Sequence, residues 1–226
     1  MFKISKRLET IANYVKPDAA VCDIGTDHGY LAIHLIENGI AKKVIAADIG
    51  EKPLKNAEEN IKKAGILGIE LRLCDGLSGI KNGEADTFVI AGMGGEVISG
   101  ILNRGANIAK TRGISFILQP TTSPEFLRRF LYENGFEILE ETPVFENSKI
   151  YSVMLVKFCG ENSNQKEGFY YIGKVKAETQ DGFKYIEKQK NRCYQCMQSL
   201  KNVAEKQEEY LYYKSVYEEI DSLINT

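Results

Sequence analysis

The sequence has little of several features that would assign its class at once. No apolar run approaches the roughly 20 residues that a membrane-spanning helix requires. The first residues, Met1–Arg7, lack the apolar core of a secretory signal. We therefore expect a cytoplasmic protein without membrane contact.

Metal-binding residues are also scarce. Only Cys193 and Cys196 have metal-like spacing, and the two histidines, His28 and His34, lie in another part of the chain. A zinc site needs about four ligands, so two cysteines on one helix face are the alternative to a metal or redox site. We expect no metal.

The chain has no excess of positive charge. Its formal net charge of −2 argues against a protein that binds nucleic acid through overall charge, but a local basic face stays possible. Of its 226 residues 43% are hydrophobic and 27% charged, which is ordinary globular composition.

Strand and helix signals alternate along the first part of the chain. Short apolar runs predict buried parallel strands, and the stretches between them have helical character. We expect strands at 19–24, 43–48, 69–73, 87–91 and 114–118, and helices at 30–37, 53–63, 96–109 and from Pro124 to about Gly135.

The pattern changes after Gly135. Strands 136–145 and 150–158 are separated only by Glu146–Lys149, which predicts a hairpin. A parallel sheet that ends in an antiparallel hairpin is the layout of Rossmann-like methyltransferases, whereas the sheet of dinucleotide dehydrogenases usually stays parallel. We expect an α/β methyltransferase domain over residues 1–160.

A polar linker, 160–166, precedes a stretch of different composition. From Phe183 to Thr226 there is neither glycine nor proline. We expect a helical, coiled-coil-like domain over 161–226, with a turn near Asn202. The seam of its two helices is expected to contain Tyr185, Met197, Leu200, Val203, Leu211, Val216, Ile220 and Leu223.

The loop after the first strand has the glycine spacing of a nucleotide-binding turn. Gly25 and Gly29 occupy its outer glycine positions, where backbone approaches a ligand closely. Asp27 stands in the middle, where a carboxylate would repel a pyrophosphate but suits the ammonium and sulfonium of S-adenosylmethionine. We therefore expect this cofactor and not NAD or FAD.

Acidic residues also follow the next two strands. Asp48 stands where an acidic side chain grips ribose hydroxyls, and Asp75-Gly76 is placed to contact the adenine. Any of these aspartates alone could be a helix cap or a turn residue. The expected cofactor-binding residues are Asp23, Gly25, Asp27, His28, Gly29, Asp48, Ile49, Asp75, Gly76, Ala91, Gly92 and Met93.

Three glycines in four residues follow the fourth strand, within Ala91–Glu96. They either leave room for a flat acceptor beside the transferable methyl group or only form a tight strand–helix turn. The next strand ends at the same edge of the sheet. The residues expected to contact the acceptor here are Gly94, Gly95, Gln119 and Pro120.

Six motifs occur in order: I-S-K-R-L at 4–8, D-I-G-T-D-H-G-Y at 23–30, D-G-L at 75–77, G-E-A-D at 83–86, A-G-M-G-G at 91–95 and L-Q-P at 118–120. Together they resemble the bacterial tRNA (adenine-22-N1)-methyltransferase family, TrmK, over about residues 3–158. The resemblance implies methyl transfer from S-adenosylmethionine to N1 of adenine 22 in tRNA, with Asp27 near the reacting groups. A small-molecule methyltransferase, or a cofactor-binding module without chemistry, is the alternative.

Asp27 is the expected catalytic residue. Adenine N1 has an in-plane lone pair and can attack a methyl group without losing a proton first. Methylation then places positive charge on the base, which a fixed carboxylate would stabilise, or it would accept a proton from the exocyclic amine. The alternative is that Asp27 only orders the cofactor loop.

The partner implied is tRNA, whose target base must leave its stack. Residues 174–206 carry eight basic and four acidic side chains, whereas one basic and five acidic side chains follow from residue 207. This segregation either pairs two antiparallel helices or presents a basic face to RNA through Lys184, Lys188 and Arg192. Further candidates are Lys3, Lys6, Arg7, Arg128 and Arg129. We expect a monomer.

Overall fold

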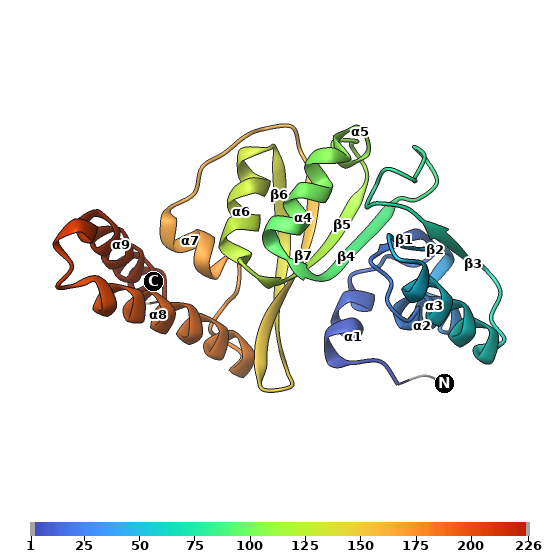
Figure 1. The fold of residues 1–226 in the computed structure, drawn as a ribbon, viewed down its shortest axis with the longest axis horizontal. Helices are drawn as coiled ribbons and strands as arrows, with labels where there is room; N and C mark the ends of the chain where they lie inside the picture. The colour runs from blue at the N-terminus through green and yellow to red at the C-terminus, as the bar shows by residue number, and fades with distance from the viewer. Residues whose placement is uncertain (1–2, 225–226) are drawn as a thin grey trace.

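The computed structural model describes residues 3–224, which form a seven-stranded sheet between helices, with a helical hairpin at one side (Figure 1). The ends of the two expected domains, Met1-Phe2 and Asn225-Thr226, lie outside the described residues. The elements are α1 (Lys6–Asn13), β1 (Ala19–Ile24), α2 (Tyr30–Glu37), β2 (Ala41–Asp48), α3 (Glu51–Ala64), β3 (Ile69–Leu73), β4 (Thr87–Gly94), α4 (Gly95–Arg104), α5 (Ala106–Ala109), β5 (Ser115–Thr122), α6 (Pro124–Glu133), β6 (Phe136–Glu146), β7 (Lys149–Phe158), α7 (Glu167–Ile172), α8 (Gln180–Leu200), a 3-10 turn (Ala204–Lys206) and α9 (Gln207–Ile224).

The strand order is β3-β2-β1-β4-β5-β7-β6. The first five strands of this order are parallel, and β7 runs antiparallel to both of its neighbours. Asn147 and Ser148 join β6 to β7 with positive φ angles of 48° and 63°, as a two-residue hairpin turn requires. The predicted parallel sheet with a terminal antiparallel hairpin is confirmed.

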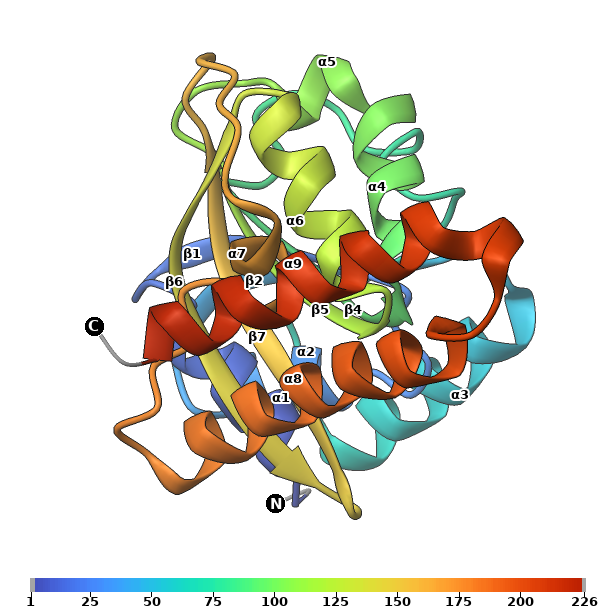
Figure 2. The ribbon, with the colours of Figure 1, turned by 90° about the vertical axis from the view of Figure 1, so that its left-hand side faces the viewer.

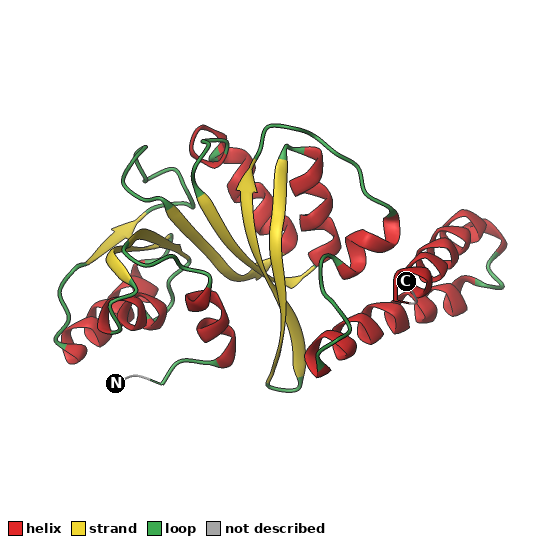
Figure 3. Ribbon diagram, turned by 180° about the vertical axis from the view of Figure 1, so that it is seen from behind, coloured by secondary structure: helices red, strands yellow, loops and turns green. Residues whose placement is uncertain are grey.

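Side chains alternate between two apolar layers because successive residues of a strand point to opposite faces. Val21, Val44 and Val89 pack with α1 and α2 on one face. Cys22 and Phe88 pack with α4 and α6 on the other. Figure 3 shows the strands enclosed between these helical layers. The sheet is therefore buried on both sides, and its strand ends are where polar groups can gather.

The structure departs from the predicted elements in several places. The helix expected at 96–109 divides at Gly105, where a Cβ would overlap the side chain of Leu77. Strand β4 continues through the glycines as far as Gly94, because this segment still pairs with β5. Helix α7 was not expected. It has only six residues and lies between the polar linker and the next loop. Packing between distant segments fixes each of these features.

The expected turn between the two C-terminal helices is confirmed, since α8 ends at Leu200. Figure 2 shows α9 crossing the molecule antiparallel to α8. The expected seam is only partly correct: Tyr185, Val216 and Ile220 are buried, whereas Leu211 is 54% exposed. Val203 and Leu223 are also exposed. The apolar face of α8 is shared between α9, α7 and Ile150 of β7, so a two-helix seam does not describe it.

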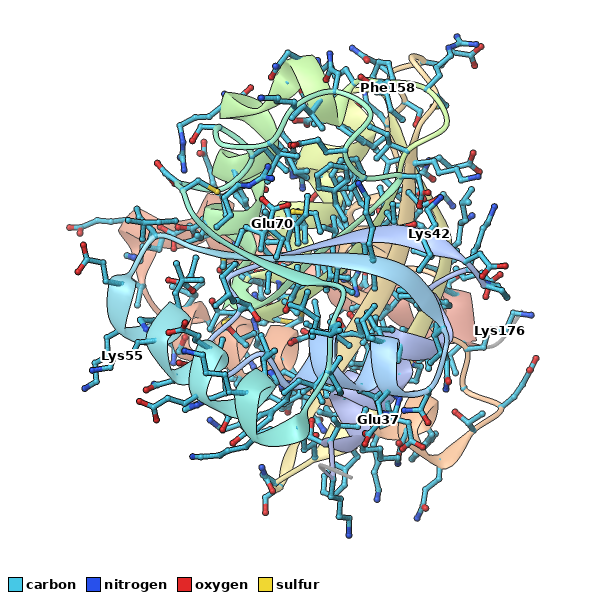
Figure 4. The ribbon with its side chains drawn as sticks, turned by 90° about the vertical axis from the view of Figure 1, so that its right-hand side faces the viewer. Glu37, Lys42, Lys55, Glu70, Phe158 and Lys176 are labelled. Atoms are coloured by element: carbon cyan, nitrogen blue, oxygen red, sulfur yellow. The ribbon has the colours of Figure 1, made fainter. Side chains whose placement is uncertain are left out.

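Charged side chains surround the β3 edge of the sheet. Glu37, Lys42 and Lys55 point outward there (Figure 4).

Within residues 3–224 no helix is both long and apolar enough to cross a membrane.

Candidate active site

A pocket of about 370 Å³ lies at the C-terminal ends of β1 and β4. The strand order reverses between these two strands, and ligands of open α/β sheets bind at such switch points. One wall is the loop from Asp23 to Leu31, and the other contains Ala91, Gly92 and the α1 residues Arg7 and Leu8. Two segments that were expected to bind the cofactor therefore border one cavity. The other residues expected to bind the cofactor, Asp48, Ile49, Asp75, Gly76 and Met93, and those expected to contact the acceptor, Gly94, Gly95, Gln119 and Pro120, do not line it.

Glycine is required at two positions of the β1 loop. Gly25 has a φ of 84°, and a Cβ on it would overlap the methyl carbon of Met93. Gly29 has a φ of 68° and begins α2 against Ala57 of α3. The bare backbone predicted from the glycine spacing is present, and the side chain of Met93 lies against it.

Asp23 is a buried carboxyl group at the end of β1. Burial raises its pKa to about 6, with a smaller raising effect of Asp48, while a hydrogen bond with Thr26 opposes the shift. No basic side chain forms an ion pair with Asp23 in the part of the chain that the structure describes. A buried carboxylate without a counterion favours a cationic ligand, which would lower this pKa.

Asp27 is exposed at the mouth of the same pocket. Its carboxylate Oδ2 lies 3.2 Å from Nε2 of His28, and 71% of its side chain is solvent-accessible. The ring of His28 stacks on Tyr30, with 5.3 Å between the ring centroids. Asp27 can thus reach a ligand without a change of backbone, and His28 limits its orientations.

The aspartates of the next two strands stand at the same edge of the sheet. Asp48 ends β2, and its Oδ1 accepts a hydrogen bond from Gly50 N at 2.7 Å. Asp75 follows β3 and accepts one from Arg104 Nη2 at 3.2 Å. Ile49 is 71% exposed beside Asp48, so an apolar surface adjoins the carboxylates. Gly76 lies against Ile101 of α4.

Gln119 is fully buried, and its amide links two parts of the site. Its Oε1 accepts hydrogen bonds from Gly92 N at 3.1 Å and from Arg7 Nη1 at 2.9 Å. Its Nε2 donates to Pro120 O at 2.8 Å. Because these bonds use both lone pairs of Oε1 and one of the two Nε2 N–H groups, the structure gives Gln119 a positioning role. Its direct contact with an acceptor stays a prediction.

Gly95 is buried where α4 begins, and a Cβ on it would overlap the carbonyl oxygen of Ser123. A Cβ on Gly94 would lie 3.0 Å from Thr122 Oγ1. These two glycines therefore let the β4–α4 and β5–α6 turns approach each other. This packing agrees with the second explanation of the glycines, a tight strand–helix turn. Contact of Gly94 and Gly95 with an acceptor stays a prediction.

A second crevice, of about 230 Å³, separates the β5–α6 turn from α8. It brings together three residues singled out in the sequence, namely Pro120, Lys188 and Arg192. Lys188 Nζ donates to Ile150 O at 3.2 Å, and Arg192 forms an ion pair with Glu125 of α6. Burial, together with Arg192 and Lys149, lowers the pKa of Lys188. Neither side chain pairs with the acidic helix α9.

The remaining basic candidates have different surroundings. Lys184 Nζ lies 4.7 Å from the ring centroid of Phe145, and Lys6 pairs with Asp181 at 3.0 Å. Arg129 pairs with Glu167. The prediction that Arg128 contacts RNA is wrong, because its side chain is fully buried and forms an ion pair with Glu141 at 2.5 Å. The sequence did not reveal this ion pair, because Glu141 lies in another element, β6.

The cysteines do not form a metal site in the described part of the chain. All five are free thiols, and no three His, Cys, Asp or Glu side chains of residues 3–224 are grouped as metal ligands. Cys193 is buried between the C-terminal helices and the sheet. The helix-face explanation of Cys193 and Cys196 agrees with this packing.

The mixed sheet, with its pocket at the switch point, defines a Rossmann-like methyltransferase. Residues 4–154 match the model of the methyltransferase domain family. The tRNA (adenine(22)-N(1))-methyltransferase of Bacillus subtilis is 38% identical over 156 residues, which are 69% of this chain and 65% of that protein. The match thus spans slightly less than two thirds of that relative.

Solved structures match almost the whole chain. The B. subtilis m1A22 tRNA methyltransferase TrmK has a TM-score of 0.88 at 28% identity, covering 99% of this chain and all of that one, 100%. The TrmK of M. capricolum, in complex with S-adenosyl-homocysteine, has a TM-score of 0.82 at 26% identity, and the match covers 99% of both chains. The chain belongs to the methyltransferase domain family and, within it, to the TrmK family.

Proposed function

We propose that this protein transfers the methyl group of S-adenosylmethionine to N1 of adenine 22 in tRNA. One observation carries the proposal: the carboxylates of the β1 loop and the backbone of Ala91-Gly92 border one pocket. The membership of the TrmK family supports the same reaction. The B. subtilis relative named above is a tRNA adenine-22 methyltransferase, and the TrmK structure from M. capricolum contains S-adenosyl-homocysteine.

The residues present fit this cofactor, which supplies an electrophilic methyl group when bound. Asp23 and Asp27 favour its positive charges, and Asp48 stands where ribose hydroxyls are bound in such folds. Gly25 lets the backbone approach it closely.

Asp27 is the proposed catalytic residue. The positive charge that develops on the adenine needs a nearby anion, and the Asp27 carboxylate is exposed beside Gly92 in the pocket. His28 positions this carboxylate through their 3.2 Å contact. Asp27→Asn retains size and removes charge, so turnover should fall far more than cofactor affinity. Equal losses of both would assign Asp27 to cofactor binding alone.

The tRNA contacts stay proposals. The crevice between β5–α6 and α8 places Lys188 and Arg192 near Pro120, so an extruded base and its neighbouring phosphates could be held by adjacent surfaces. Lys184 is retained as a more distant contact. A domain boundary near residue 160, a monomeric state and a cytoplasmic location also stay predictions.

The decisive experiment is methylation of unmodified tRNA transcripts with S-adenosylmethionine, followed by mass identification of the nucleoside. We expect 1-methyladenosine, and its loss when position 22 of the transcript is changed to guanosine. A product on small molecules but not on tRNA would support the small-molecule alternative. Binding of the cofactor without any methyl transfer would support the non-catalytic alternative.

A further inference from the structure

The crevice between the β5–α6 turn and α8 is a neighbour of the pocket at the β1 loop, although no described residue lines both cavities. Gln119 accepts hydrogen bonds from Arg7 and Gly92 of the pocket, and the next residue of β5, Pro120, lines the crevice. Tyr151 of β7 also lines the crevice, and the guanidinium of Arg7 lies over its ring, 5.4 Å from the centroid. The two cavities are therefore close enough to hold neighbouring parts of one ligand.

A buried glutamine of α8 has unused hydrogen-bond donors in the crevice. Gln189 is only 2% exposed, and it lines this cavity. Its Oε1 lies 3.5 Å from Arg192 Nη1, whereas its Nε2 donates to no acceptor within residues 3–224. A buried donor without an acceptor is unfavourable, and a ligand that accepts from it removes this penalty. An amide offers a donor and an acceptor side by side, which is the pattern that pairs with the edge of a nucleobase.

Positive charge gathers at the same crevice. Lys188 Nζ uses one of its three N–H groups for Ile150 O, and Lys149 and Arg192 lie close enough to act on it electrostatically. Arg192 pairs with Glu125, but neither this carboxylate nor any other described Asp or Glu lines the cavity. The charge and the remaining donors therefore favour an anionic ligand group such as a phosphate.

We infer that this crevice binds one RNA nucleotide adjacent to the target adenine and recognises its base; this inference rests on the proposed function. The Tyr151 ring stacks on the base, the Gln189 amide forms hydrogen bonds with the base edge, and Lys188 contacts the phosphate. Unstacked bases of RNA are recognised by aromatic stacking and by hydrogen bonds to their edges, and extrusion of the target adenine separates it from its stacked neighbour. The crevice therefore reads the sequence beside the methylated base.

Competition between tRNA transcripts tests the binding of a neighbouring nucleotide. On each side of the target adenine in turn, the base is removed or replaced, and any pairing partner is changed to match. In the wild type, removal of the base on one side should lower kcat/KM roughly 5- to 100-fold, the usual effect of losing a base–aromatic stack. Replacement of the same base should lower kcat/KM roughly 2- to 10-fold, because only the hydrogen bonds to its edge are lost.

Two glutamines of α8 supply the variant and its matched control. Gln189→Met removes the amide and keeps a side chain of similar length, so replacement of the neighbouring base should no longer change kcat/KM. Gln195→Met makes the same change at an exposed position that does not line the crevice, and it should retain the wild-type discrimination between bases. Tyr151→Leu should instead reduce the effect of removing the base. Thermal denaturation and calorimetry with S-adenosylmethionine report whether each variant folds and binds the cofactor.

The wild-type series, which requires no substitution, separates failure of this inference from failure of the proposed function. If the unaltered transcript yields no 1-methyladenosine, the proposed function is wrong. If that transcript is methylated and removal of either neighbouring base leaves kcat/KM unchanged, the crevice binds no neighbouring nucleotide. If Gln189→Met lowers kcat/KM by the same factor for every transcript, Gln189 does not read the base and its contribution is structural.

Discussion

Two buried charged residues in different regions of the molecule have opposite surroundings. Asp23, at the switch point of the sheet, has no ion-pair partner within residues 3–224, and burial raises its pKa to about 6. Arg128, between the sheet and the C-terminal helices, is surrounded by acceptors. An unpaired buried charge is costly unless a ligand compensates it, whereas a paired one is structural. These surroundings favour a ligand-binding role for Asp23 and a structural role for Arg128.

The surroundings of Arg128 come from several elements. Its guanidinium donates to Glu141 of β6, to the carbonyl oxygens of Tyr170 and Tyr171 of α7, and to the hydroxyl of Tyr185 in α8 at 2.7 Å. Burial alone would lower the pKa of Arg128, but the nearby carboxylate of Glu141 and hydroxyl of Tyr185 raise it above its usual value. This cluster joins the helical hairpin to the sheet by polar contacts, while the interior of the sheet is apolar.

Arg128→Ala should have the largest effect on stability. Loss of one partner leaves the Glu141 carboxylate buried without its counterion, which costs about 3–5 kcal/mol of unfolding free energy. Urea denaturation measures this loss. Arg129→Ala is the matched control in the same helix, because its pair with Glu167 is partly exposed and contributes about 0–1 kcal/mol. Similar losses in both variants would contradict the structural role of Arg128.

The contrast also shows what a sequence can predict. Strand β1, helix α2 and strand β3 begin and end where the apolar pattern places them, because that pattern reports burial within one segment. The glycines and aspartates of the β1 loop were equally visible, because they lie close together in the sequence. The pair Arg128–Glu141 was not visible, because it depends on two elements meeting in space. Arg7 was found only as a basic residue in the I-S-K-R-L motif, and its place at the pocket required the tertiary structure.

Asp23→Asn should stabilise the ligand-free protein. The pKa of Asp23 is about 6 in the folded state against 3.8 in the unfolded chain. The folded state therefore binds the Asp23 proton more tightly than the unfolded chain does. The unfolding free energy accordingly decreases as pH rises through about 6. A permanently neutral side chain should add on the order of 1–3 kcal/mol at pH 8 and almost nothing near pH 4.

The same substitution should weaken cofactor binding, which separates a binding role from a structural one. Calorimetry in the wild type should show affinity falling as pH decreases below about 6, and Asp23→Asn should flatten this dependence. Asp27→Asn is the control for stability, because Asp27 is exposed and its neutralisation should leave the unfolding free energy unchanged. A destabilised Asp23→Asn protein would mean that the carboxylate is needed by the fold.

Lys188→Gln should weaken tRNA binding several-fold. Its side chain lines the crevice beside Pro120, so a lost phosphate contact should also reduce the slope of log affinity against log salt by about 1. Filter binding at several salt concentrations measures both effects. An unchanged salt slope would place the RNA elsewhere and leave Lys188 as a bond between α8 and Ile150.

Lys190→Gln should have the smallest effect, and it sharpens the comparison between the two sides of α8. Lys190 lies two residues from Lys188, but its Nζ pairs with Asp221 of α9 at 2.5 Å and lies 5.2 Å from the Tyr217 ring centroid. Such a partly exposed pair contributes about 0–1 kcal/mol. The substitution should therefore lower the unfolding free energy slightly and leave tRNA affinity and its salt dependence as in the wild type. If it weakens tRNA binding as much as Lys188→Gln does, the RNA responds to the total charge of α8 and not to the side that lines the crevice.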